Sequence, residues 1–311
     1  MSELNIKGGG LSASFTSHGA AMIDLRLEGH DRSLILAHDE ISKYKSYNGY
    51  HGAIVGRYAN RIRNGEFSID QKDYLLEKNW LGKHTLHGGF SSTAYSDWQV
   101  KEHSKDSITF STIDEQSRSG FPGTCYIEIT YSLMGDQTLD VEIRAVADTQ
   151  TPCSITPHPY FNLSNEKLVH QHLFEINAET YLPVDDECMP LGNIEKVEGT
   201  EFDFRKLRTL TTAKNYDHNF CISKARGELQ LMVSAKANDS GIGMDVWSNE
   251  TGLQFYTGSG LKADFSPYQG FCVEPQAWPD APNNSNFPNS LIQANQPYEH
   301  MIKYVFSRTN V

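Results

Sequence analysis

The 311-residue chain has few cysteines, and their arrangement excludes the common cysteine-based sites. No Cys-x-x-Cys pair occurs, and the odd number of five rules out a complete set of internal disulfides. The cysteines are scattered at Cys125, Cys153, Cys188, Cys221 and Cys272. This pattern predicts reduced, buried thiols in a cytoplasmic protein rather than a disulfide framework or a zinc knuckle.

Long apolar segments are also missing. The first residues, "MSELNIKGGGLSASF", contain no apolar core of a secretory signal, and no run of 18 apolar residues occurs anywhere. The sequence therefore predicts no export signal and no membrane-spanning segment. Together with the cysteine pattern, this favours a cytoplasmic location.

Positive charge is in deficit. The chain has 27 Lys and Arg against 39 Asp and Glu, a formal net charge of −12. An acidic surface argues against nucleic acid and anionic membranes as partners, and it leaves a neutral small molecule open. Motifs for nucleophilic or phosphate chemistry are lacking too: no Gly-x-Ser-x-Gly is present, and the glycines at 8–10 precede no Lys-Ser/Thr.

The most frequent pattern in the sequence is the alternation of apolar and polar residues, with a period of two. "YIEITYSL" (126–133) and "TLDVEIRAVA" (138–147) each alternate apolar and polar residues, and Gly-Asp-Gln lies between them. Two such runs joined by a short Gly-containing connection predict a β-hairpin. A second hairpin is predicted at 66–77, and further strands at 107–114, 228–235, 253–258 and 271–275.

Helical signals are weak, with short helical turns expected only near 41–47 and 288–293. No linker, repeat or low-complexity tract interrupts the strand pattern. Many evenly spaced strands with Gly, Asn and Asp turns are typical of an antiparallel sandwich or barrel. We therefore predict an all-β protein whose residues 1–311 form a single domain.

Two histidines lie in unusual surroundings. His158, in "TPHPYFNL" (156–163), stands between two prolines, which restrict the backbone on both sides. His87, in "TLHGGF" (85–90), precedes two glycines that would permit close approach of a ligand. The plain alternatives are a turn histidine at 158 and a β-turn with a bystander histidine at 87. A rigidly held imidazole is what proton transfer requires.

Other polar residues occupy strand-like or aromatic surroundings. Glu274 lies in the apolar run 271–275, and half-burial there would raise its pKa. Gln254 faces the same side of its strand as Tyr256. Asp217, in "NYDHNF" (215–220), is either a turn cap or a hydroxyl acceptor between aromatics, as in sugar-binding grooves.

The segment "GRYANRI" (56–62) adds two arginines, Arg57 and Arg61. Each is open to two interpretations, a surface charge or an anchor for sugar hydroxyls or a developing oxyanion.

Metal sites are not indicated by spacing. His84 and His87 form one pair and His170 and His172 another, but neither has a third ligand at a typical spacing. Residues 185–187, Asp-Asp-Glu, lack the glycine and terminal glutamate of a calcium loop and are interpreted as a solvated acidic turn. We expect no metal and no cofactor.

Taken together, the motifs resemble those of the aldose 1-epimerase (galactose mutarotase) family. The resemblance is carried across residues 56–288 by "GRYANRI", "LHGG", "HPYFNLS", "YDHNF", "GLQFYTG" and "EPQAWPDAPNNSNFP". The terminal "PYEHMIKYVFS" is similar to the family's last strand. The resemblance implies a large antiparallel β-sandwich that binds a monosaccharide on a concave face, as a monomer or a homodimer.

The resemblance also implies roles for individual residues. Glu274 in Glu-Pro-Gln corresponds to the general base, and His158 to the general acid. The implied substrate-binding residues are Asn60, Arg61, His87, Asp217 and Gln254. Family members commonly have Asn or Gln before the acid histidine and Ser or Thr after it, whereas this chain has Pro157 and Pro159.

The implied activity is interconversion of the α and β anomers of a free aldose such as galactose or glucose. Ring opening and reclosure change no oxidation state and move no phosphate, so a base and an acid suffice. Two alternatives remain. A hexose-6-phosphate mutarotase would need a basic cluster, for which only Arg57, Arg61 and Arg63 are close in sequence. A non-catalytic sugar-binding module would share the fold but not need the base and acid.

Overall fold

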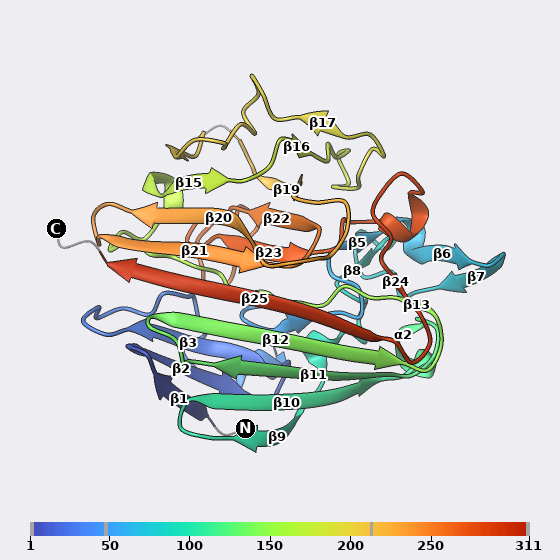
Figure 1. The fold of residues 1–311 in the computed structure, drawn as a ribbon, viewed down its shortest axis with the longest axis horizontal. Helices are drawn as coiled ribbons and strands as arrows, with labels where there is room; N and C mark the ends of the chain where they lie inside the picture. The colour runs from blue at the N-terminus through green and yellow to red at the C-terminus, as the bar shows by residue number, and fades with distance from the viewer. Residues whose placement is uncertain (1–2, 47–48, 212–213, 309–311) are drawn as a thin grey trace.

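The computed structural model describes residues 3–46, 49–211 and 214–308, and strands dominate them. The largest sheet runs across the molecule in Figure 1. Its nine antiparallel strands are, in spatial order, β18 (Arg208–Thr209), β15 (Leu173–Ile176), β20 (Gln230–Ala237), β21 (Ile242–Ser248), β25 (Pro297–Arg308), β12 (Thr138–Ala147), β11 (Cys125–Ser132), β10 (Ser107–Asp114) and β9 (Gln99–His103).

Alternating sequence explains the centre of this sheet. In β11, Ile127 and Ile129 are fully buried whereas Glu128 between them is exposed. β12 pairs with β11 in antiparallel register, with Tyr131 opposite Val141. The hairpin predicted at 126–147 is therefore confirmed, because one apolar face per strand seeks the core.

Smaller sheets pack against the long one and complete the sandwich. A five-stranded sheet has the order β17 (Glu195–Lys196), β16 (Thr180–Tyr181), β19 (Asp217–Cys221), β22 (Gly252–Tyr256) and β23 (Cys272–Gln276), and a three-stranded sheet contains β1 (Leu4–Gly8), β2 (Leu11–Thr16) and β3 (Ala21–Leu27). Four strand pairs are β4 (Ile54–Val55) with β14 (Thr156–Pro157), β5 (Arg61–Ile62) with β8 (Thr85–Leu86), β6 (Glu66–Ile69) with β7 (Lys72–Leu75), and β13 (Thr151–Pro152) with β24 (Leu291–Ile292).

Helices are short, as the sequence predicts. The described residues form α1 (Lys43–Ser46), α2 (Gln116–Ser119) and the 3₁₀ turns η1 (Arg63–Gly65), η2 (Thr93–Tyr95), η3 (Val169–Gln171) and η4 (Ala281–Asn283). The turn expected near 41–47 is confirmed by α1 as far as the described residues reach. The turn expected at 288–293 is wrong, because residues 291–292 pair with β13 as strand β24. None of the helices in the described ranges is long and apolar enough to cross a membrane.

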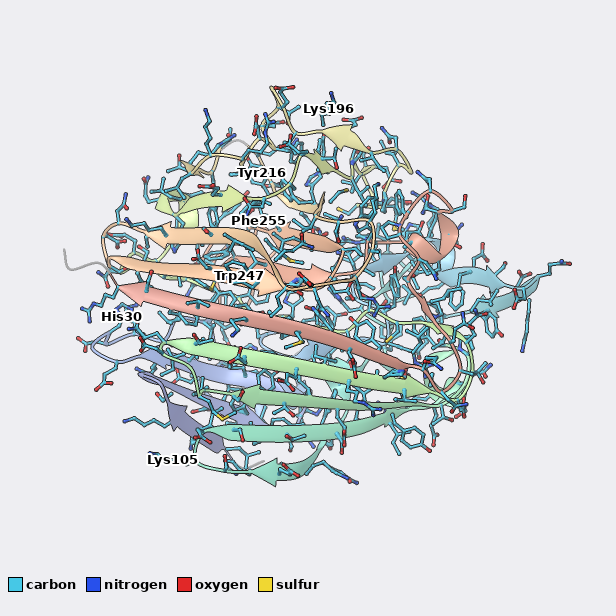
Figure 2. The ribbon with its side chains drawn as sticks, in the orientation of Figure 1. His30, Lys105, Lys196, Tyr216, Trp247 and Phe255 are labelled. Atoms are coloured by element: carbon cyan, nitrogen blue, oxygen red, sulfur yellow. The ribbon has the colours of Figure 1, made fainter. Side chains whose placement is uncertain are left out.

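The core between the long and the five-stranded sheets is aromatic. Phe255 on β22, labelled in Figure 2, is fully buried. Its ring centroid lies 4.8 Å from that of Phe174 on β15 and 5.7 Å from that of Phe204. Since neighbouring residues of a strand point to opposite faces, Gln254 and Tyr256 point away from this core. The outer face of β22 is thereby left to carry polar groups.

Candidate active site

The predicted site residues converge on one cavity of about 370 Å³. It is lined by Asn60, Arg61, His87, His158, Asp217 and Glu274, together with Gly49, Tyr50, His51, Trp80, Leu86, Tyr160, Tyr256, Gly260, Leu261 and Lys262. Gln254 does not line the cavity but lies behind Asp217, because its Nε2 donates to the Asp217 Oδ1 at 2.6 Å. The residues come from distant parts of the chain and share no local pattern.

Three strands of the five-stranded sheet present much of this polar face. Asn219 on β19, Gln254 on β22 and Glu274 on β23 lie opposite one another in register. Two residues further along each strand, on the same face, Asp217 is opposite Tyr256, and Tyr256 is opposite Cys272. Because successive residues of a strand point to opposite faces, the apolar neighbours of these residues build the core, and Asp217, Tyr256 and Glu274 line the cavity from the other face.

His158 is fixed by its backbone as well as by its prolines. It follows β14, its N–H donates to the Ala53 carbonyl at 2.9 Å, and its carbonyl accepts from the Gly52 N–H at 2.9 Å. Pro157 and Pro159 have no N–H, so they leave this pair of hydrogen bonds to His158 alone. The backbone that carries the imidazole is therefore anchored on both sides of the residue.

His158 and Glu274 form a close pair. The His158 Nε2 lies 3.6 Å from the Glu274 Oε2, which has no hydrogen-bond partner among the described residues. Glu274 is 2% exposed, so the half-burial expected from the sequence understates its enclosure. Burial raises the pKa of the Glu274 carboxyl well above its usual value, and the Asp217 carboxylate adds to this. Burial also lowers the pKa of His158 to about 4.

His87 is clasped by Asn60. The His87 N–H donates to the Asn60 carbonyl at 2.8 Å, and the Asn60 N–H donates to the His87 Nδ1 at 3.0 Å. The clasp requires close backbone approach: a Cβ on Gly88 would lie 2.1 Å from the Gly56 carbonyl oxygen. Because Nδ1 accepts a backbone N–H, the neutral ring carries its proton on Nε2. Burial lowers the pKa of His87, so His87 presents a fixed N–H donor.

Arg61 and Asp217 form a nearly buried ion pair beside these histidines. The Arg61 Nη2 lies 3.0 Å from the Asp217 Oδ2, and the Arg61 Nε has no partner among the described residues. The Arg61 guanidinium carbon lies 4.6 Å from the Trp80 ring centroid, a cation–π contact. Burial raises the pKa of the Asp217 carboxyl, but Arg61 and the Gln254 amide outweigh this and hold the pKa below its usual value. Asp217 is thus a carboxylate with both oxygens engaged.

Asn60 acts partly through Arg61. The Asn60 Oδ1 accepts from the Arg61 N–H at 2.9 Å and from its Nη1 at 3.4 Å. Its side-chain oxygen is thereby committed to holding the arginine.

Aromatic side chains make up walls that the sequence did not single out. The Tyr50 ring centroid lies 4.6 Å from that of His87 and 5.8 Å from that of His158. Tyr160 lies 5.0 Å from His158 and stacks on His51 at 4.6 Å. Aromatic faces suit the C–H faces of a sugar ring. Tyr160 lies within the "HPYF" motif, but no local signal marks Tyr50 or His51.

Arg57 is neither a surface charge nor a substrate anchor. Its side chain is fully buried, and its Nε lies 2.8 Å from the Asp114 Oδ2. Its Nη1 also donates to the Pro122 carbonyl at 2.6 Å. Both interpretations from the sequence are wrong, because Arg57 is a structural link between β4 and the end of β10. The acidic turn at 185–187 is likewise tied down, since the Glu187 Oε2 lies 2.6 Å from the Lys83 Nζ.

Three neighbouring side chains in the cavity are of types that bind metal ions. Ligand atoms of His87, His158 and Glu274 lie within 4.8 Å of one another, a set that sequence spacing missed. A metal-bound histidine needs a bare nitrogen toward the ion and usually donates its other N–H to an acceptor. The His87 Nδ1 instead receives the Asn60 N–H, so its Nε2 carries the proton. Two ligands remain, which do not fit a zinc site.

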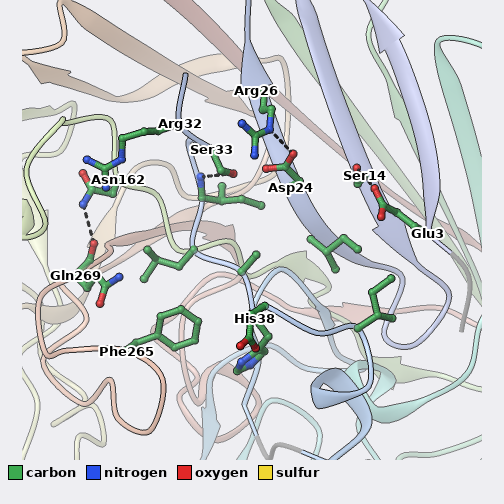
Figure 3. A pocket seen from close by; sticks show the side chains of 16 residues that line it. Glu3, Ser14, Asp24, Arg26, Arg32, Ser33, His38, Asn162, Phe265 and Gln269 are labelled. Carbon is green, nitrogen blue, oxygen red and sulfur yellow. Dashed lines mark hydrogen bonds and ion pairs between the residues drawn. The ribbon is translucent and has the colours of Figure 1, made fainter. Parts of the chain in front are cut away.

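A second cavity, of about 540 Å³, lies between β3 and the segment 32–41. Figure 3 shows two of its polar contacts, between Arg26 and Asp24 and between Asn162 and Gln269. The Arg26 Nε lies 2.6 Å from the Asp24 Oδ2, and the Asn162 Nδ2 donates to the Gln269 carbonyl at 2.9 Å. It holds none of the predicted site residues.

The first cavity therefore has the parts for moving two protons on a polyhydroxylated ring. A buried carboxyl and an imidazole stand side by side, and N–H donors and a carboxylate surround them. Together with the large antiparallel sandwich, this defines a carbohydrate isomerase of the mutarotase class.

Comparison with known proteins agrees. The family model for aldose 1-epimerase matches residues 3–305. Galactose mutarotases of Bos taurus and Homo sapiens are 35% and 34% identical to this chain, and each match covers 90% of this chain and 85% of the mutarotase. The aldose 1-epimerase of Haemophilus influenzae is 31% identical over 90% of this chain and 87% of its own. The crystal structure of an aldose epimerase homologue from C. elegans matches with a TM-score of 0.94 and 28% identity, covering 99% of both chains.

The chain belongs to the aldose 1-epimerase family. It is an isomerase, a mutarotase, and the fold expected from the sequence resemblance is confirmed.

Proposed function

We propose that Glu274 is the general base and His158 the general acid in the interconversion of the anomers of a free aldose. The observation that carries this assignment is the 3.6 Å approach of the His158 Nε2 to the Glu274 Oε2 in the cavity. At that separation, one anomeric centre can reach both groups, with O1 on the carboxylate and the ring oxygen O5 on the imidazole.

The reaction balances with these two groups alone. Glu274 takes the proton of the C1 hydroxyl while His158 gives a proton to O5, so that the C1–O5 bond breaks and C1=O1 forms. The aldehyde turns about C1–C2. His158 then takes the O5 proton, O5 attacks the opposite face of C1, and Glu274 returns its proton to O1. No external oxidant, reductant or metal is required.

The remaining groups hold the sugar while C1 turns. The His87 Nε2–H is a permanent donor, because Asn60 fixes its tautomer. Arg61 offers its unpartnered Nε–H, and the Asp217 carboxylate borders the cavity. We assign Gln254 a supporting role, since its amide donates to Asp217 rather than lining the cavity.

The relatives named galactose mutarotase support a free hexose, galactose or glucose, as the substrate. The hexose-6-phosphate alternative finds no basic cluster among the described residues. Arg57 is buried on Asp114, Arg61 is paired with Asp217, and Arg63 approaches Asp185 at 3.3 Å. Among the residues that line the cavity, Lys262 is a lysine, and its side chain is exposed.

We further propose that residues 1–311 act as a single domain in the cytoplasm, as a monomer or a homodimer. One hydrophobic cluster extends from Ile6 to Phe306, which supports a single folding unit. The free cysteines, four of them buried, suit a reducing compartment.

The substrate class can be tested by polarimetry. We expect the protein to accelerate mutarotation of α-galactose and α-glucose well above the rate in buffer, and to act on the corresponding 6-phosphates with a lower kcat/KM. A protein that binds these sugars without changing the polarimetric rate would be a sugar-binding module. A preference for the 6-phosphates would contradict the free-aldose assignment.

Removing the Gln254 amide should weaken substrate binding more than chemistry. In Gln254→Ala, the Asp217 carboxylate loses one hydrogen bond and orients hydroxyls less well. We expect KM to rise about 2- to 10-fold, the worth of one hydrogen bond, with kcat nearly unchanged. Steady-state polarimetry measures both constants.

The matched control is Gln99→Ala on the exposed strand β9, which should change neither constant. A fall of kcat at constant KM in Gln254→Ala would show that Gln254 serves the chemical step. Asp217→Ala is a poorer probe, because it would leave the nearly buried charge of Arg61 unpaired and destabilise the fold.

A further inference from the structure

The second nitrogen of the acid histidine also has a side-chain neighbour. The His158 Nδ1 lies 3.6 Å from the Cys272 Sγ, within the range of a sulfur hydrogen bond. Cys272 is fully buried, and it stands two residues before Glu274 on the same face of β23. One strand thus presents a carboxyl to one ring nitrogen of His158 and a thiol to the other.

The acid–base cycle dictates what Nδ1 must do. Protons leave and return at Nε2, which faces Glu274. In the imidazolium both nitrogens carry protons, and after transfer to O5 the neutral ring must keep its proton on Nδ1. Nδ1 is therefore a donor throughout the cycle and needs an acceptor in a buried site.

We propose that Cys272 is a positioning residue whose sulfur accepts the His158 Nδ1–H and fixes the tautomer that leaves Nε2 free to exchange its proton. This inference rests on the proposed role of His158 as the acid. The chemistry is non-covalent, and the thiol keeps its own proton.

The neighbouring His87 shows the opposite arrangement. Its Nδ1 accepts a backbone N–H from Asn60 at 3.0 Å, so its proton sits on Nε2. The two rings are 5.2 Å apart. A backbone donor against one Nδ1 and a sulfur acceptor against the other would hold the two histidines in opposite tautomers, one as a fixed donor and one as a proton carrier.

Cys272 suits this task because it is neutral and immobile. Burial raises the pKa of its thiol well above the usual value, and the nearby Glu274 and Asp217 carboxyls raise it further. A neutral sulfur can accept a hydrogen bond without forming an ion pair with the imidazolium. The backbone of His158 is anchored separately by Ala53 and Gly52, so a change at Cys272 should alter the ring and leave the main chain in place.

Kinetics of two substitutions test the inference. Cys272→Ala removes the acceptor, and we expect kcat to fall about 2- to 10-fold with KM unchanged, as for the loss of one weak hydrogen bond. Cys272→Ser restores an acceptor and should recover much of the rate. Cys125→Ala, which removes a buried thiol on β11, is the packing control and should leave kcat unchanged.

The tautomer itself is visible in long-range ¹H–¹⁵N spectra of the imidazole nitrogens. We expect neutral His158 to carry its proton on Nδ1 in the wild type and to shift toward the Nε2–H form in Cys272→Ala. An Nε2–H tautomer in the wild type would overturn the inference, and so would an unchanged tautomer and rate in Cys272→Ala. Full activity of His158→Asn would instead refute the acid assignment, while the spectra would still report on the Cys272 contact.

Discussion

His158→Asn should lower kcat by about 10²- to 10⁴-fold, the usual worth of a positioned general acid. Asparagine keeps a polar side chain, but it is shorter than histidine and cannot deliver a proton to the ring oxygen. The backbone hydrogen bonds to Ala53 and Gly52 do not involve the ring, so the fold should survive. Polarimetry gives the rate after subtraction of spontaneous mutarotation in buffer.

The pH profile of the same variant adds a sharper check. The remaining catalyst would be Glu274, whose pKa is raised by burial. Residual activity should therefore increase as pH rises through that pKa, with no fall on the basic side. His103→Asn on the exposed strand β9 is the matched control. A loss of kcat smaller than threefold would show that His158 is not the acid.

Much of the site could be predicted from local sequence because each key residue lies in a distinctive short motif. The double-proline setting singled out His158, and the two glycines singled out His87, although the close approach at Gly88 is to the Gly56 carbonyl and not to a ligand. The strand register then brings Glu274 to the same cavity face as Asp217. Alternation sufficed for β10, whose bounds of 107–114 equal the predicted ones.

The misses have a common physical origin in contacts between residues distant in sequence. Arg57 looked like a candidate anchor because its partners, Asp114 and Pro122, belong to another part of the sheet. Trp80 could not be connected with Arg61 before the fold brought the two side chains together. Pairing with β13 converted residues 291–292 from an expected helical turn into a strand.

The protonation of the acid–base pair is another property that depends on the fold. If neither group were perturbed, the carboxylate would be ionised at neutral pH and the imidazole would have a pKa of about 6.5. Burial moves the pKa of Glu274 up and that of His158 down to about 4, which favours one shared proton on a neutral pair. The ion pair is the form that opens the ring, and the neutral pair is the form left when the aldehyde is open. Bringing the two forms closer in free energy suits a reversible reaction.

A bell-shaped dependence of kcat/KM on pH follows, and its two limits belong to the pair rather than to either residue. The active enzyme carries one proton on the two groups. On the acid side activity should fall near pH 4, because protonation of His158 there gives the pair two protons instead of one. On the basic side it should fall at the raised pKa of Glu274, where the shared proton is lost.

Glu274→Gln should have an effect as large as His158→Asn and a mirror-image pH profile. Glutamine matches the size of glutamate and can still bond the C1 hydroxyl, but it cannot take its proton. We expect kcat to fall about 10²- to 10⁴-fold with little change in sugar affinity. Residual activity would depend on the His158 imidazolium alone, so it should rise as pH falls and lose the acid limb.

Stability provides an independent readout of the same substitution. The pKa of Glu274 is raised in the folded protein above its unfolded value of about 4.3. Ionisation of Glu274 therefore destabilises the wild-type fold, and this loss of stability grows as pH rises from the unfolded pKa to the folded pKa. Glu274→Gln lacks this titration, and its Tm relative to the wild type should increase between pH 5 and pH 8. Glu128→Gln, on the exposed face of β11, should show neither effect. Near wild-type turnover by Glu274→Gln, with the acid limb still present, would remove Glu274 from the role of base.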